Sequence, residues 1–105
     1  MQQQDELINA LLKRGVTRIY SGYWVCDAII FQSREKIICA VLNENMQPGL
    51  TRYLPYKNTV DRSKNVAYVF TKNSDFYLQN AIQNFAANDR YEQLRFANYI
   101  VFVPL

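Results

Sequence analysis

Two short runs of this sequence are apolar or aromatic at every position: Ile37–Leu42 and Val66–Phe70. A strand with one face in water alternates apolar and polar residues, whereas a strand covered on both faces has no such alternation. Both runs therefore predict strands buried on both faces, as in a parallel sheet covered by helices. This pattern constrains the fold more than any other feature of the chain.

Segments with helical periodicity alternate with the predicted strands. Asp5 is a candidate cap for a first helix, and Gly15 supplies the left-handed residue that ends it. The apolar stripe of that helix is Leu7, Ile8, Leu11 and Leu12. Further helices are expected over Tyr23–Gln32, Lys57–Ser63 and Tyr77–Ala86, and further strands over Val16–Tyr20, Tyr91–Phe96 and Tyr99–Val103.

This order predicts an α/β fold, a three-layer sandwich with helices on both faces of a mostly parallel sheet. The sheet is expected to have four or five strands in the order 2-1-3-4, with the last strand antiparallel. At 105 residues, the chain (1–105) is expected to form a single domain with its own core. The segment Arg52–Tyr56 is expected to be extended, and Pro55 excludes it from the centre of a sheet.

The charge of the chain argues against a nucleic-acid partner. Twelve Lys and Arg against nine Asp and Glu give a net charge of +3, and the cations are scattered along the sequence. No apolar run reaches the roughly 20 residues that span a bilayer, and the first residues lack the pattern of a signal peptide. We expect a domain that is soluble as given, and a candidate fragment of a longer protein. Its localisation stays open.

Two cysteines, Cys26 and Cys39, allow two interpretations. The first is a pair of small buried apolar side chains. The second is a disulfide, because the helix with Cys26 is expected to pack on the sheet that contains Cys39. With no histidine in the chain, a zinc site is not expected.

The stretch Tyr20–Asp27 is the strongest candidate for a binding site. It joins the first strand to the second helix, at the switch point where open α/β sheets bind ligands. Aromatic faces beside a few polar groups suit a sugar or another flat ligand. In the alternative interpretation, Tyr20 and Trp24 are core and the outer tyrosines cover the sheet edge. The candidate ligand-binding residues are Tyr20, Ser21, Tyr23, Trp24, Asp27, Arg52, Tyr53 and Asn73.

Catalytic chemistry is not indicated. Without histidine, no Ser-His or Cys-His pair can form. The carboxylates Asp27, Asp61 and Asp75 are each expected beside a helix start, in a capping or dipole role. Ser21-Gly22 is not a glycine-rich phosphate loop, although the backbone amides after Gly22 could hold a phosphate. We predict no catalytic residue, no metal and no cofactor.

The segments Leu11–Trp24, Phe31–Ile38, Arg52–Tyr56 and Ala67–Phe70 together resemble a known family. In the same order, they are similar to the soluble C-terminal region of bacterial, especially cyanobacterial, membrane glycosyltransferases of the protein-mannosyltransferase type. The resemblance covers most of residues 7–70. The matching positions are Tyr20, Tyr23, Trp24, Arg52 and Tyr53. Family members often have a small-acidic pair after the first tyrosine, where this chain has Ser21-Gly22.

The resemblance implies a non-catalytic accessory domain. In that family a membrane-embedded body takes a sugar from a polyprenyl-phosphate donor, and the catalytic carboxylate lies in that body. The implied partners are the membrane-embedded part of the same polypeptide or a protein partner, and a glycan or a polyprenyl-phosphate sugar. The alternative is a free-standing regulatory module that binds a nucleotide or another small ligand. A homodimer through an exposed apolar edge at Tyr99–Val103 is a further candidate.

Overall fold

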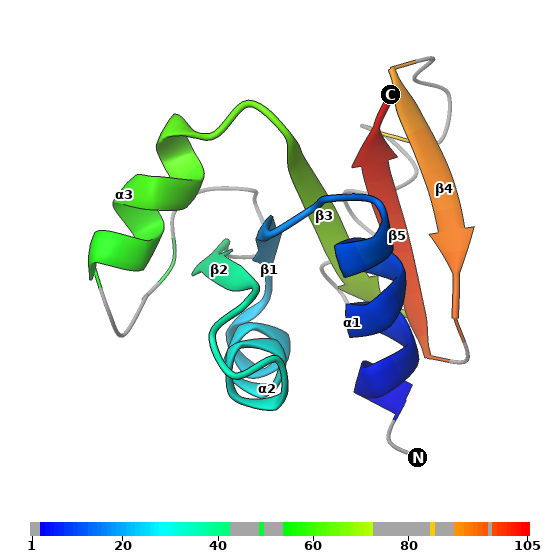
Figure 1. The fold of residues 1–105 in the computed structure, drawn as a ribbon, viewed down its shortest axis with the longest axis horizontal. Coiled ribbons are helices and arrows are strands. Elements are labelled where there is room, and N and C mark those ends of the chain that lie inside the picture. Colours follow the sequence, from blue (N-terminus) through cyan, green and yellow to red (C-terminus); the bar gives the residue numbers. More distant parts are fainter. Residues whose placement is uncertain (1–2, 43–48, 50–53, 73–84, 86–89, 97) are drawn as a thin grey trace.

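The computed structural model describes residues 3–42, 49, 54–72, 85, 90–96 and 98–105. Within these ranges it contains three helices and five strands (Figure 1). They are α1 (Gln3–Lys13), β1 (Arg18–Ser21), α2 (Tyr23–Gln32), β2 (Ile38–Val41), α3 (Leu54–Arg62), β3 (Val66–Thr71), β4 (Tyr91–Arg95) and β5 (Tyr99–Pro104). The predicted α/β class is confirmed.

The five strands form one mixed sheet in the order β2-β1-β3-β5-β4. β1 is parallel to both β2 and β3, so the two continuous apolar runs flank the first strand as predicted. β5 is antiparallel to β3 on one side and to β4 on the other. The last strand is thus antiparallel to its neighbours, and the order extends from the expected 2-1-3-4 to 2-1-3-5-4.

The position of β5 follows from its side chains. Tyr99–Val103 are all buried, whereas β4 alternates half-buried residues with exposed Gln93 and Arg95. An exposed apolar edge promotes aggregation, so an entirely apolar strand is favoured between two neighbours, while a strand with charged residues tolerates an edge. The apolar edge expected at Tyr99–Val103 is therefore not present, because β4 covers it. A homodimer cannot form through this edge of β5, because the edge is already paired with β4.

Helices cover both faces of the sheet. On one face, called the α1/α2 face, Leu7, Leu11 and Ile29 pack against Ile19, Val69 and Val101. On the other face, called the α3 face, Val60 of α3 packs against Ala40 of β2 and Val66 of β3. Figure 1 shows α3 and α2 on opposite sides of β2 and β1. The three layers are as predicted.

The rest of the α3 face has an aromatic core. Phe70 and Phe102 are buried beside Phe85, and half-buried Tyr68 and Tyr91 pack against them. Ring centroids in this cluster are 4.6–6.2 Å apart, mostly in tilted or edge-to-face arrangements. The expected helix over Tyr77–Ala86 lies outside the described residues except for Phe85.

The end of α1 confirms the predicted glycine stop. Gly15 has a φ of +72°, the left-handed region that favours glycine. The amide of Val16 donates to the carbonyl of Leu11 and the amide of Gly15 to that of Leu12, which closes the helix. Arg14 then makes a bidentate ion pair with Glu92, with nitrogen–oxygen distances of 3.0 and 3.1 Å. This pair joins the end of α1 to β4.

The prediction of an extended Arg52–Tyr56 segment is wrong for its described residues. Leu54 begins α3, and Pro55 is the second residue of that helix. Proline is tolerated there because the first amides of a helix have no intrahelical partner. The carbonyl of Pro55 accepts a hydrogen bond of 2.9 Å from the hydroxyl of Thr59. The helix expected over Lys57–Ser63 therefore starts three residues earlier.

Candidate functional site

The last two residues of β1 face opposite sides of the sheet. Successive strand residues alternate between faces, and Ile19 is buried on the α1/α2 face. Ser21 therefore lies on the α1/α2 face, and Tyr20 packs on the α3 face. Tyr23, which follows the turn at Gly22, packs against the α1/α2 core. The structure thus divides the predicted aromatic site between two faces of the sheet.

Ser21 holds two strands together. Its side chain is fully buried, and its hydroxyl donates a hydrogen bond of 2.7 Å to the carbonyl of Val69 in β3. The amide of Leu42 in turn donates to the carbonyl of Ser21, at 2.9 Å. Ser21 therefore joins β1 to both neighbouring strands at their carboxyl ends. Its hydroxyl has no access to the surface.

Among the described residues of the predicted site, the Tyr23–Trp24 corner is the part that is exposed to solvent. Trp24 is 80% exposed, although it follows a half-buried tyrosine. The two rings meet edge to face, with centroids 5.1 Å apart and planes at 90°. The interpretation that places Trp24 in the core is wrong, because α2 buries Cys26 and Ile29 instead. Most of the Trp24 side chain is thus presented to solvent.

Covalent and polar contacts fix α2 behind this corner. Cys26 and Cys39 form a disulfide between α2 and β2, which decides between the two interpretations of the cysteines. At the other end of α2, the buried hydroxyl of Ser33 accepts a hydrogen bond of 3.1 Å from the amide of Ile37. Trp24 therefore projects from a helix that is held at both ends.

The other predicted ligand-binding residues are partly outside the described structure. Asp27 is half-buried and lies one turn after Trp24 in α2. It is the fifth residue of the helix, so the expected capping position is wrong; the N-cap is Gly22. Arg52, Tyr53 and Asn73 lie outside the described residues. Asp75, the third expected helix cap, also lies outside them.

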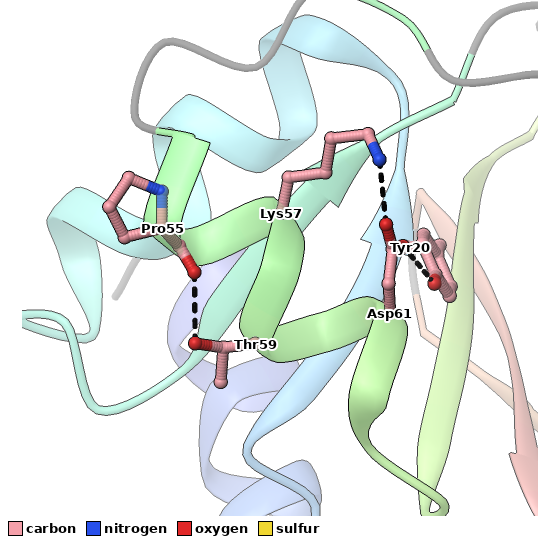
Figure 2. A network of polar contacts seen from close by, with 5 residues as sticks. All are labelled: Tyr20, Pro55, Lys57, Thr59 and Asp61. Carbon is pink, nitrogen blue, oxygen red and sulfur yellow. Dashed lines mark hydrogen bonds and ion pairs between the residues drawn. The ribbon is translucent and has the colours of Figure 1, made fainter.

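A second polar cluster lies on the α3 face and was not predicted (Figure 2). The hydroxyl of Tyr20 donates a hydrogen bond of 2.5 Å to Oδ1 of Asp61. Nζ of Lys57 lies 2.6 Å from Oδ2 of the same carboxylate. Asp61 is in the last turn of α3, not beside a helix start as expected. The i,i+4 spacing of Lys57 and Asp61 was the sequence signal for this pair.

The protonation states in this cluster follow from its contacts. Hydrogen bonds from Lys57 and then from Tyr20 hold the pKa of Asp61 below its usual range. Burial, and then the hydrogen bond to Asp61, raises the pKa of Tyr20. Tyr20 therefore stays a neutral donor and Asp61 an ionised acceptor near neutral pH. Such a pair holds α3 on β1, and it offers neither a free base nor a phenolate nucleophile.

The ring of Tyr20 is also fixed. It stacks on Tyr68 of β3 with centroids 5.3 Å apart and planes at 25°. Burial, and then the neighbouring Tyr91, raises the pKa of Tyr68 as well. Tyr20 thus links the aromatic cluster to α3, on the face of the sheet opposite the core against which Tyr23 packs.

A groove of about 400 Å³ lies between α1 and the turn after α2. Its apolar wall is Ile8 and Leu12, and Arg34 and Lys36 lie among its polar residues. Arg34 and Glu35 have φ values of 54° and 64°. Because this turn precedes β2, the groove lies at the amino ends of the parallel strands, away from the Tyr23–Trp24 corner.

In the part of the chain that the structure describes, no group of three or more His, Cys, Asp or Glu side chains is placed to hold a metal ion. No helix in the same part is long and apolar enough to cross a bilayer. Comparisons with protein-family models, with curated proteins and with solved structures found no match. The proposal for function therefore depends on the geometry and on the sequence resemblance.

Proposed function

We propose that this chain is a non-catalytic accessory domain of a membrane glycosyltransferase-like protein. Its Tyr23–Trp24 corner would bind a glycan or acceptor, or dock on the membrane-embedded part of the same polypeptide. The order of motifs in residues 7–70 suggests that the parent protein is a membrane glycosyltransferase. The observation that carries the proposal is the 80% exposure of Trp24 on a helix that is fixed at both ends.

The geometry of the corner suits a sugar ring. A pyranose presents a flat apolar face of C–H groups, which stacks on an exposed aromatic ring. Tyr23 supports the indole edge to face, and α2 supplies a rigid base. An anchor whose position is fixed before binding loses little conformational entropy when the ligand arrives. Half-buried Asp27, one turn along the helix, is a candidate polar contact.

Three polar groups that could act as a nucleophile, acid or base are committed to internal hydrogen bonds. The hydroxyl of Ser21 is bound to the backbone of β3, and Tyr20 and Asp61 are bound to each other on the opposite face. These groups therefore stabilise the fold. A side chain that acts as a general base must be free to accept a proton at the reacting atoms.

Fluorescence of Trp24, the single tryptophan of the chain, tests ligand binding directly. The purified chain is titrated with mannose, a manno-oligosaccharide and farnesyl phosphate as a short polyprenyl phosphate. We expect a saturable change in emission with at least one probe. Calorimetry with the same probe should show at least tenfold weaker binding to Trp24→Ala, a loss of about 1.4 kcal/mol.

Phe31→Ala is the matched control, because Phe31 is 79% exposed on the same helix. This variant should bind like the unchanged chain. A flat response to all three probes, or equal binding by Trp24→Ala, would remove the ligand-binding part of the proposal. Hydrophobic spans encoded upstream in the same reading frame would support docking on a membrane-embedded part.

The second candidate is a free-standing module for a nucleotide or small anion. It is favoured by the N-terminus of α2, where Gly22 gives no side-chain cap and the first turn has no acidic residue. Backbone amides and the helix dipole favour an anion at such an end. A ligand that binds only the native state must raise the melting temperature. No shift with millimolar ATP, GTP or inorganic phosphate would count against this candidate.

A further inference from the structure

Both cysteines of the chain are used in one buried bond. Cys26 and Cys39 are joined with a Cα–Cα distance of 5.2 Å, which is within the range that disulfides span. Their side chains are 1% and 0% exposed, and no other cysteine is present. They belong to the α1/α2 core, together with Ile29 of α2 and Ile19 of β1.

This environment is typical of a structural disulfide. Catalytic and redox-sensing cysteines are accessible, and their reactivity depends on a thiolate stabilised by nearby positive charge. Here the sulfur atoms lie among apolar side chains, and thiol–disulfide exchange requires access for an attacking thiolate. Reduction would therefore require that α2 first opens away from β2. The bond would persist as long as the domain stays folded.

We infer that the domain folds and works in an oxidising compartment, outside the cytosol, and that the Cys26–Cys39 bond is a permanent clip. In the cytosol the glutathione and thioredoxin systems keep such thiols reduced, whereas disulfides persist in secreted and periplasmic domains. On formation, the two thiols lose two protons and two electrons. The electrons pass to the disulfide of an exchange partner, which becomes a dithiol as the new S–S bond forms.

The clip also bears on the Tyr23–Trp24 corner, and this part rests on the proposed function. Cys26 lies two residues after Trp24, in the first turns of α2. A covalent bond there holds the start of the helix against β2, so the direction of the indole is fixed relative to the sheet. In a glycosyltransferase-like parent, the corner would then face the side of the membrane away from the cytosol.

Thiol trapping in cells tests the compartment. The full protein in its native host is quenched with acid, denatured, and treated with a maleimide–polyethylene glycol reagent with or without prior reduction. We expect no added mass without reduction and two added groups after it. Two reactive thiols without reduction would show that the chain is reduced in the cell, and this would overturn the assignment. The readout does not involve ligand binding, so it is independent of the proposed function.

Thermal unfolding of the purified chain tests whether the Cys26–Cys39 clip stabilises the fold. Closing a loop of this size stabilises a small domain enough to shift the melting temperature by roughly 10–20 °C. We expect the Cys26→Ala/Cys39→Ala variant to melt lower by that amount, and the unchanged chain to match it once unfolded and refolded in a strong reductant. The oxidised chain should keep its bond in millimolar glutathione at 25 °C for hours.

Two results would contradict the claim that the Cys26–Cys39 bond is a permanent, stabilising clip. One is a melting temperature that is the same with and without the bond, measured on the reduced and oxidised forms of the unchanged chain. The other is rapid reduction of the folded chain by glutathione, at the rate of the denatured chain. If the double variant fails to fold, the comparison of the reduced and oxidised forms still decides.

Discussion

Tyr20 and Ser21 are neighbours in β1, yet their hydroxyl groups enter opposite faces of the sheet and meet different partners. On the α1/α2 face, Ser21 is fully buried and bonds to a backbone carbonyl among aliphatic side chains. On the α3 face, Tyr20 reaches a charged carboxylate at the edge of an aromatic cluster. On the α1/α2 face, the elements are thus joined by a disulfide and by a hydrogen bond to the backbone. On the α3 face, they are joined by ring stacking and a partly exposed ion pair.

The difference shows where a binding surface can exist. Polar groups that are committed to internal bonds hold the fold in place, and they occur on both faces at the end of β1. Among the residues that the structure describes, the exposed aromatic at this end is Trp24, which extends from α2 on the face that the disulfide fixes. A rigid support behind an exposed ring is what a recognition surface requires.

The largest expected effect compares adjacent residues of β5. Phe102 belongs to the aromatic cluster and Val101 to the α1/α2 core. Phe102→Ala should lower the free energy of unfolding by about 3–5 kcal/mol, because a large cavity opens in the cluster. Val101→Ala removes a smaller side chain and should cost less. Denaturant unfolding measures both, and an equal or smaller loss for Phe102→Ala would mean that the aromatic face is loosely packed.

Ser21→Ala tests the backbone bond of the α1/α2 face. The variant leaves the buried carbonyl of Val69 without the hydroxyl donor, at a cost of about 1–3 kcal/mol in the free energy of unfolding. The matched control is Ser63→Ala. Ser63 donates to the carbonyl of Thr59 at 2.8 Å, but it is only half-buried, so we expect a smaller loss. Equal losses of unfolding free energy in urea would show that the full burial of the Ser21 hydrogen bond adds no stability.

A double-mutant cycle of Tyr20→Phe and Asp61→Asn tests the bond on the α3 face. Phenylalanine keeps the stacking on Tyr68 and removes only the hydroxyl. We expect a coupling of about 0.5–1 kcal/mol, because the carboxylate is partly exposed to solvent. The cycle compares the unfolding free energies of the four proteins. Additive effects of the two substitutions would show that the bond contributes no stability.

The pH dependence of the Asp61 contribution is the smallest effect. Because the folded pKa of Asp61 is lowered, its stabilisation is complete above the usual carboxyl value, near ~3.9, and is lost as the pH falls through the folded pKa. The stability difference between the unchanged chain and Asp61→Asn should be constant from about pH 5 to 7 and shrink below about pH 4. Urea unfolding at several pH values measures this stability difference. A stability difference that grows as the pH falls would contradict the lowered pKa of Asp61.

Much of the fold follows from residue patterns. Continuous apolar runs predicted the two parallel neighbours of β1, Gly15 predicted where α1 ends, and Gly22 predicted where α2 begins. The insertion of β5 between β3 and β4 was not predicted, although the fully apolar Tyr99–Val103 favours an interior strand. Pro55 excludes the centre of a sheet, but proline suits the first turn of a helix equally well, and this is its place in α3.

The candidate site was harder to predict than the fold. The sequence indicated the turn at Gly22, but not which side chains point outward, because this depends on which face α2 turns to the sheet. Helix α2 is apolar almost all round, so its pattern does not separate Trp24 from Cys26. The Tyr20–Asp61 bond and the disulfide join residues that the sequence separates by 41 and 13 positions. Such pairings depend on the register of the sheet.

Quenching of Trp24 fluorescence by acrylamide tests most directly whether the Tyr23–Trp24 corner is an open surface on a folded domain. Trp24 is the single tryptophan, so the signal reports this corner alone. At 80% exposure, the Stern–Volmer constant of the native, oxidised chain should approach that of the chain in denaturant. A native constant several-fold lower would show that the indole is covered, and this would contradict the account.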